Sequence, residues 1–163
     1  MFDLAPCDEE FFVSAPDQYS FTLDLPVPAA RVWEGLSNAT PLSWCRALSG
    51  GRYTSAPPHH VGTTREIKAL GLLHLKEEFF RWDEGVRHSF WVTQSNLPLF
   101  HRFAEDYLVE PTADGCRFTW SFASEPVKGL SWPSGLAAMP NRALYKSLEF
   151  DTRRHFTRSA KAH

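Results

Sequence analysis

The most regular feature of this 163-residue chain is a set of segments in which hydrophobic and polar residues alternate. In the first of them, residues 19–25, the hydrophobic positions are Tyr19, Phe21, Leu23 and Leu25. Alternation with a period of two is typical of a strand that buries one face. The same pattern predicts strands over residues 52–55, 63–69, 73–82, 86–94, 101–110 and 116–124. We therefore expect a sheet of about seven strands.

Short glycine-containing turns join the longest of these segments. Gly85 ends the turn Asp83-Glu84-Gly85, and Gly115 ends the turn Ala113-Asp114-Gly115. Glycine adopts the positive φ angles that tight hairpin turns require. Because consecutive strands joined by such turns run antiparallel, the chain is expected to form a meander.

Two short helices are expected between the first strand and the rest of the sheet. Pro28 suits the first turn of a helix, where its missing N–H costs nothing. The hydrophobic residues at positions 29, 32, 33 and 36 would form the buried stripe of that helix. The Thr40-Pro41 pair, with Thr40 as N-cap, predicts a second helix over residues 42–48.

A long helix is expected near the end of the chain, over residues 141–160. Its apolar face, at spacings of three and four, consists of Tyr145, Leu148, Thr152, Phe156 and Ala160. Residues 126–140, which contain three prolines, are expected to form a loop. Prolines also interrupt residues 1–18, which we interpret as an irregular N-terminal extension of a single domain over residues 19–163.

Composition and charge exclude several classes of protein. The net charge of −2 and a pI near 6.4 give no basic footprint for nucleic acid. The basic residues from Arg153 onward suit a solvated helix C-terminus. The chain has no apolar run long enough to cross a bilayer and no basic segment typical of a signal peptide. Its three scattered cysteines suit a reducing compartment, so we expect a cytoplasmic protein without stable membrane insertion.

Four stretches of the chain resemble a known superfamily. They are residues 25–33 (LPVPAARVW), 61–65 (VGTTR), 80–87 (FRWDEGVR) and 104–120, which contains AEDYLVEP and DGCRFTW. Together with the order of elements, they make the chain similar to START-like proteins of the SRPBCC branch, the polyketide cyclase/dehydrase type. The resemblance implies an α+β helix-grip (Bet v 1-like) fold. In that fold a curved seven-stranded antiparallel sheet, two short helices and a long C-terminal helix enclose a cavity.

The resemblance also implies a ligand site between the sheet and the last helix. Alternation within the strands nominates the side chains that face this site. The candidate ligand-binding residues are Trp44, Arg65, Ile67, His88, Phe90, Phe103, Glu105, Tyr107, Trp120, Tyr145 and Leu148. The apolar loop residues Leu97, Leu99 and Phe100 are expected either to gate the cavity or to pack against the last helix or a homodimer mate.

Arg65 is the candidate with the sharpest physical consequence. If it points inward, its guanidinium needs a partner, because an unpaired charge in a cavity is costly. That partner would be Glu105 or an acidic or carbonyl-bearing ligand, and a resembling aromatase/cyclase pocket also uses an arginine. The alternative places Arg65 on the solvated outer face of its strand.

Catalytic and metal chemistry have less support in the sequence. His88 with Glu105, or His101 with Asp106, could form an acid–base pair, although nothing in their spacing requires it. The adjacent pair at positions 59 and 60 has no third metal ligand at a suitable spacing. Because phosphate-loop, HExxH and GxSxG motifs are missing from the sequence, we expect neither a cofactor nor a metal.

Three functions stay open at this point. The ring-rich strand faces favour a binder or carrier of a hydrophobic small molecule of lipid, polyketide or aromatic type. The resemblance allows an aromatase/cyclase-like enzyme acting on a poly-carbonyl chain. The apolar loop and the basic C-terminal end allow a protein-interaction module with a collapsed cavity.

Overall fold

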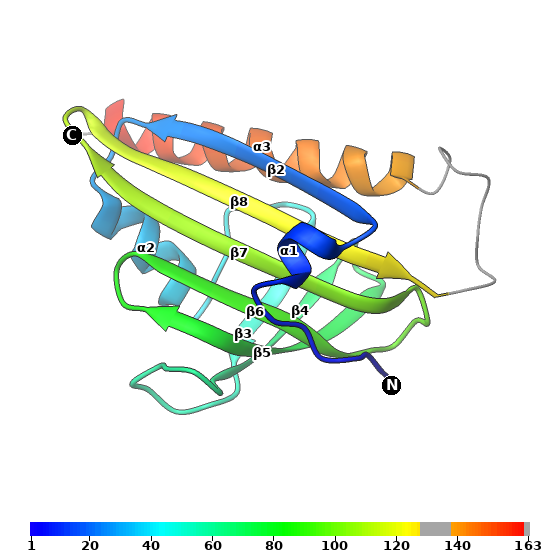
Figure 1. Cartoon of the computed structure of the whole chain (residues 1–163). Helices are drawn as coiled ribbons and strands as arrows, with labels where there is room; N and C mark the ends of the chain where they lie inside the picture. Colours follow the sequence, from blue (N-terminus) through cyan, green and yellow to red (C-terminus); the bar gives the residue numbers. More distant parts are fainter. Residues whose placement is uncertain (128–137, 162–163) are drawn as a thin grey trace.

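The computed structural model describes residues 1–127 and 138–161, which form a strongly curved antiparallel sheet with three helices (Figure 1). The seven long strands are β2 (Asp17–Leu25), β3 (Leu48–Tyr53), β4 (Thr64–Ala69), β5 (Leu73–Asp83), β6 (Arg87–Ser95), β7 (Phe100–Thr112) and β8 (Gly115–Pro126). Their order across the sheet is β2-β8-β7-β6-β5-β4-β3, and the short β1 (Phe2–Asp3) pairs with β6. The expected helix-grip fold is confirmed, with β1 as an eighth strand.

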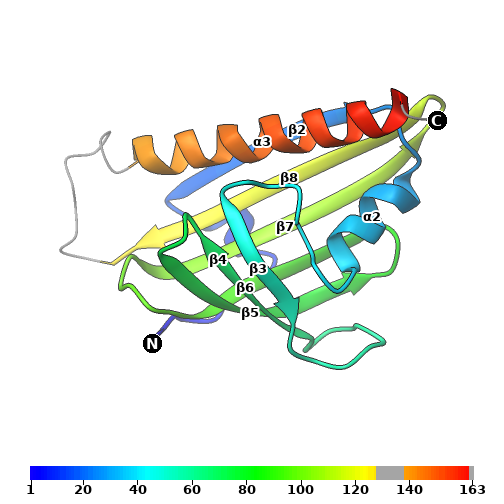
Figure 2. The ribbon, with the colours of Figure 1, turned by 180° about the vertical axis from the view of Figure 1, so that it is seen from behind.

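The helices occupy different sides of the sheet. Helix α3 (Ala138–Lys161) runs along β2 and β8 on the concave side, and α2 (Ala29–Ser37) lies at one end of the same side (Figure 2). Helix α1 (Phe11–Ser14) lies on the convex side (Figure 1). There Phe11 is buried in a small cluster with Ala104 and Ala123. None of the described helices has the length and apolar character needed to cross a bilayer.

The two glycine turns have the conformations that the sequence predicts. Gly85 has a φ of 78° in the turn between β5 and β6. Gly115 has a φ of 152°, and a Cβ atom built there would lie 2.1 Å from the carbonyl oxygen of Leu25. Only glycine fits such a close approach of two backbone segments. These turns fix the register of the longest strands and therefore which residues face inward.

Helix α3 buries the face that its periodicity predicts. Tyr145, Leu148, Thr152 and Phe156 are all buried against the interior. The helix begins at Ala138, earlier than expected, while residues 128–137 of the expected loop lie outside the described residues. Helix and sheet together therefore enclose the concave side along most of its length.

The expected helix over residues 42–48 is wrong. That segment forms consecutive turns, and β3 begins at Leu48 instead of residue 52. Leu42 has a φ of 59°, which is outside the right-handed helical region. The side chain of Asn38 accepts the Thr40 N–H at 2.9 Å, so a local turn replaces the expected helix start.

Candidate functional site

A cavity of about 240 Å³ lies between the sheet and α3. It is lined by β4, β5, β7, β8, the turn before β3, the loop before β7 and α3. The nominated residues that line it are Arg65, Ile67, Leu97, Leu99, Phe100, Phe103, Glu105, Tyr107, Trp120, Tyr145 and Leu148. The residues that alternation predicts to face inward therefore lie mostly around one cavity.

Three nominated residues do not line the cavity. Trp44 donates its indole N–H to the Oγ1 atom of Thr152 at 2.9 Å and so ties the turn segment to α3. His88 and Phe90 are fully buried within a packed part of the interior, and His88 stacks on Trp82 with a ring-centroid distance of 5.0 Å. These three side chains pack within the protein and are not among the residues that line the cavity.

The structure also adds cavity residues that the sequence reading missed. They are Leu42, Leu48, Ala69, Leu70, Leu72, Leu73, Leu75, Glu77, Phe122 and Leu144. The most consequential is Glu77, which lies directly opposite Arg65 in the pairing of β4 and β5. Its position in the alternating series Leu73, Leu75, Glu77 and Phe79 was the signal that could have found it.

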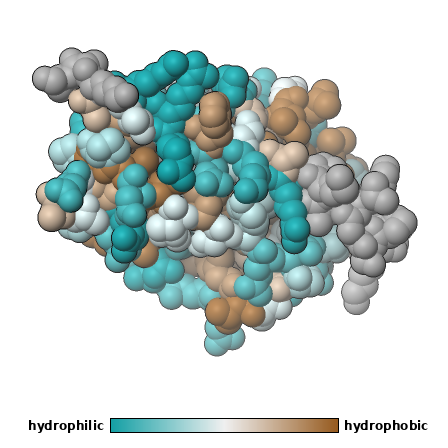
Figure 3. Space-filling model, turned by 90° about the horizontal axis from the view of Figure 1, so that it is seen from above, coloured by the Kyte–Doolittle hydropathy of each residue, from teal (hydrophilic) through white to brown (hydrophobic). Residues whose placement is uncertain are grey.

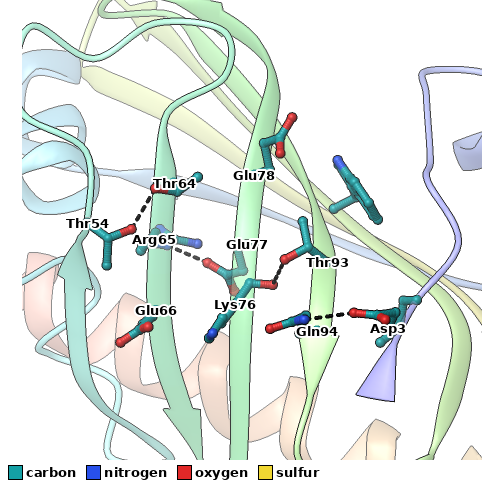
Figure 4. A pocket seen from close by; sticks show the side chains of 12 residues that line it. Asp3, Thr54, Thr64, Arg65, Glu66, Lys76, Glu77, Glu78, Thr93 and Gln94 are labelled. Carbon is teal, nitrogen blue, oxygen red and sulfur yellow. Dashed lines mark hydrogen bonds and ion pairs between the residues drawn. The ribbon is translucent and has the colours of Figure 1, made fainter. Parts of the chain in front are cut away.

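Arg65 points inward and is fully buried. Its Nε atom donates to Oε2 of Glu77 at 2.6 Å, so its partner is Glu77 and not the expected Glu105 (Figure 4). Aromatic rings surround the guanidinium, with the centroid of Phe90 4.5 Å and that of Phe79 5.2 Å from Cζ. Such cation–π contacts stabilise a desolvated guanidinium in addition to the ion pair.

Glu105 is the polar group on the opposite wall, in the middle of β7. Its Oε2 atom accepts two hydrogen bonds, from the hydroxyl of Tyr107 at 2.9 Å and from the indole N–H of Trp120 at 2.8 Å. Burial raises the pKa of Glu105 to about 8, and the nearby carboxyl of Glu77 adds to this effect. Glu105 is therefore largely protonated at neutral pH.

The two expected acid–base pairs do not form. Both ring nitrogens of His88 are buried without a hydrogen-bond partner in the described part of the chain. Burial and the charge of Arg65 hold the pKa of His88 well below its usual value. His101 is exposed, whereas Asp106 accepts hydrogen bonds from Ser89 and Arg87. Neither histidine is placed for proton transfer with its expected partner.

Exposed leucines form a rim beside the cavity. Leu70 and Leu72 belong to the turn between β4 and β5 and are 62% and 72% exposed, and Leu97 is 39% exposed. The side chain of Asn96 accepts the N–H of His74 at 2.8 Å and donates to the carbonyl of Leu72 at 2.9 Å. Asn96 therefore fastens the expected gating loop to the opposite turn.

Seen from above, α3 carries mostly hydrophilic residues, and hydrophobic ones gather in smaller patches (Figure 3).

A second hollow, of about 580 Å³, is an open groove on the convex face of β4, β5 and β6 (Figure 4). Its polar side chains bond to one another or to their neighbours. Thr54 contacts Thr64 at 2.6 Å, and Gln94 donates to Asp3 at 2.7 Å. Because small-molecule sites are typically enclosed and mostly apolar, the smaller interior cavity is the better candidate.

Comparisons with known proteins agree with this architecture. A family model described as polyketide cyclase/dehydrase and lipid transport matches residues 18–149. An uncharacterised protein of Mycobacterium tuberculosis is 32% identical over 126 residues, which cover 74% of each chain. An uncharacterised protein of Mycobacterium bovis matches to the same extent.

Solved structures with low sequence identity share the fold. A START superfamily protein from Mycobacterium smegmatis superposes with a TM-score of 0.70 at 10% identity, covering 86% of this chain and 97% of its own. The major latex-like protein 151 of Panax ginseng gives a TM-score of 0.61 at 16% identity, with the same coverage. With the family model spanning most of its length, the chain belongs to the polyketide cyclase/dehydrase and lipid transport family, and its fold is START-like.

Proposed function

We propose that this protein binds or carries a hydrophobic small molecule in the cavity between the sheet and α3, without transforming it. The observation that carries the proposal is the apolar composition of the residues that line the cavity. Among the 21 described residues that line the cavity, Arg65, Glu77 and Glu105 are the only carboxylic acids or bases, and the others are aliphatic or aromatic. Such a lining favours apolar ligands that carry few polar groups.

The size of the cavity limits the ligand. At about 30 Å³ per water molecule in the liquid, 240 Å³ is the volume of roughly eight waters. A compact one- or two-ring molecule, or a short chain, suits this space. Covering roughly 250 Å² of apolar ligand surface contributes about 6 kcal/mol. Association costs offset much of this, so micromolar affinity is expected unless polar contacts add to it.

The polar groups of the cavity favour binding over catalysis. Arg65 is neutralised by Glu77, and the Oε2 atom of Glu105 is held by Tyr107 and Trp120. A cyclase-like reaction on a poly-carbonyl chain needs an acid and a base that both reach the substrate. His88, the expected base, lies outside the cavity lining.

A titration with the neutral two-ring fluorescent probe 1-aminonaphthalene tests the proposal. We expect saturable binding at one site per chain with a blue-shifted emission. Leu148→Phe, which adds bulk to the cavity wall, should weaken binding at least tenfold. Val86→Phe, at an exposed turn far from the cavity lining, is the matched control and should bind as the wild type does.

Circular dichroism would first establish that both variants fold, and Leu75→Phe would replace Leu148→Phe if that variant does not. Probe binding that never saturates would contradict the proposal. So would equal affinity in the cavity variant and the Val86→Phe control.

A further inference from the structure

The carboxyl group of Glu105 is held by one oxygen only. Both hydrogen bonds given by Tyr107 and Trp120 end on Oε2. An indole N–H can only donate, so Oε2 must act as an acceptor whatever the charge of the carboxyl group. Among the side chains that the structure describes, those of residues 1–127 and 142–160, none forms a hydrogen bond with Oε1.

The free oxygen belongs to the cavity. Glu105 is only partly buried, although it lies on a central strand between Phe90 of β6 and Phe122 of β8. It lines the cavity, so its accessible surface faces that space. Oε1 is therefore the atom of this group that an enclosed ligand would meet.

Among the residues that the structure describes, no cation is free to balance a negative charge on Glu105. The buried cation among the cavity residues, Arg65, already forms an ion pair with Glu77 at 2.6 Å. A second carboxylate in the same apolar space would be both desolvated and repelled by Glu77. The group is accordingly neutral near pH 7, as its raised pKa of about 8 also indicates. In the arrangement in which Tyr107 and Trp120 both donate to Oε2, the proton is carried by Oε1.

We propose that Glu105 is a specificity-determining residue that donates a hydrogen bond from Oε1 to an uncharged oxygen acceptor of the ligand, a carbonyl in the simplest case. This inference rests on the proposed binding function. It predicts that the protein selects ketones and esters over hydrocarbons of the same shape and discriminates against carboxylates.

Arg65 does not offer an alternative anchor for a carboxylate. Its Nη1 and Nη2 atoms are buried and lack a hydrogen-bond partner within the described residues. The ring centroids of Tyr53, Phe79, Phe90 and Tyr107 lie 4.5–5.9 Å from Cζ and cover the guanidinium. An anion approaching Arg65 would also meet the carboxylate of Glu77.

The other titratable groups around Glu105 do not change their protonation state near neutral pH. Burial raises the pKa values of Tyr107, of Tyr145 on α3 and of Cys45 in the turn segment, so these groups stay neutral. Arg65 on β4 stays protonated, and His88 on β6 stays neutral. Glu77 on β5 is held in its ion pair, although burial raises its pKa. A variant of Glu105 separates the titration of Glu105 from that of Glu77.

Three probes with one naphthalene skeleton and substituents of equal size test the inference: 2-acetylnaphthalene, 2-isopropenylnaphthalene and 2-naphthoate. At pH 6.5 we expect the ketone to bind about five- to tenfold more tightly than the hydrocarbon, the gain of about one hydrogen bond. The naphthoate should bind most weakly. Calorimetric titration would give the three dissociation constants.

Variants and pH identify the donor. In Glu105→Gln the amide N–H replaces the carboxyl proton, so the preference for the ketone should persist at pH 6.5 and at pH 9.5. In the wild type it should disappear by pH 9.5, when Glu105 is ionised. Glu105→Leu should lose the preference for the ketone and should bind the hydrocarbon with the affinity of the wild type. If Glu105→Leu does not fold, the pH series with Glu105→Gln suffices.

The possible failures are distinguishable. Equal affinity for ketone and hydrocarbon in the wild type at pH 6.5 would overturn the inference and leave the binding function intact. Tightest binding of the naphthoate would overturn it in favour of Arg65 as anchor. Failure of all three probes to bind would overturn the proposed function and this inference together.

Discussion

The concave face of the sheet has two halves that differ in how the interior is filled. At the end covered by α2, rings contact one another in what we call the aromatic cluster: Trp33, Tyr53, Phe79, Trp82 and His88. At the other end, α3 spans the sheet and leaves the cavity of about 240 Å³. In both halves, alternate residues of the sheet strands face the interior.

What differs is the element that covers each half. Helix α2 brings Trp33 into edge contact with Trp82 and His88, with ring centroids 5.7 and 5.1 Å apart. Glu84 accepts the indole N–H groups of both tryptophans, at 2.8 and 2.7 Å. Each ring of that half therefore packs against at least one other ring of the cluster. The half under α3 is free to hold a ligand.

The Arg65–Glu77 pair lies between the two halves, and breaking it should have the largest effect. Glu77→Leu leaves a buried guanidinium without its carboxylate, so we expect a loss of about 3–5 kcal/mol in the free energy of unfolding. Removing both charges in Arg65→Met/Glu77→Leu should restore most of that stability. Urea denaturation would measure all three proteins.

Glu66→Leu is the matched control, because Glu66 pairs with the exposed Arg52 one position along β4. That exposed pair should contribute less than about 1 kcal/mol. Similar losses for the Glu77 and Glu66 variants would show that Arg65 is not dependent on its buried partner.

Two truncations on β5 compare the halves directly. Phe79 is fully buried in the aromatic cluster, and Phe79→Ala should cost about 3–5 kcal/mol. Leu75 lines the cavity, so it has fewer neighbours to lose, and Leu75→Ala should cost about 2 kcal/mol. Leu75→Ala should also admit larger probes. Urea denaturation would measure both variants. A larger loss in the free energy of unfolding for Leu75→Ala than for Phe79→Ala would contradict the division of the interior into a packed half and a half that holds the cavity.

Acid should weaken the aromatic cluster through His88. The folded pKa of His88 is lower than its unfolded value of about 6.5, because burial disfavours the imidazolium. The unfolded state therefore binds more protons below pH 6.5, and stability falls as the pH falls. Between pH 7.5 and 5 this costs about 2 kcal/mol.

His88→Leu should lose that component, which would appear as a flatter dependence of the free energy of unfolding on pH than in the wild type. Parallel curves for the two proteins would mean that folding does not lower the pKa of His88. That result would contradict its full burial without a hydrogen-bond partner among the described residues.

The smallest expected effect concerns the entrance to the cavity. Asn96→Ala removes the two hydrogen bonds that join the loop before β7 to the turn after β4, at a cost of about 1 kcal/mol. Stopped-flow experiments should show a several-fold faster release of the bound probe. Asn38→Ala removes a comparable turn contact at the other end and should leave the release rate unchanged. Equal rates in all three proteins would exclude a gating role for this loop.

Local sequence patterns predicted the framework of this molecule well. The alternating segments became strands, and the apolar stripe from Tyr145 to Phe156 became the buried face of α3. Local patterns were wrong at residues 42–48, because Leu42 adopts a positive φ that no neighbouring residue signals. Helix start signals there were outweighed by turn contacts.

The division between packed and hollow halves could not be predicted from the strands. His88 and Phe90 have the same inward parity as cavity residues, yet His88 belongs to the aromatic cluster and Phe90 packs against its member Phe79. Only the placement of α2 and α3 decides which inward residues meet a ligand. Glu77 was predictable in principle, because it alternates with Leu75 and Phe79 and lies opposite Arg65.

A crystal structure of the protein with 2-acetylnaphthalene at pH 6.5 tests the central claim most directly. Our account predicts the naphthalene rings in the cavity between β5, β7 and α3, with the carbonyl oxygen about 2.7 Å from Oε1 of Glu105. A ligand found only in the convex groove, or a cavity closed by its own side chains, would contradict it.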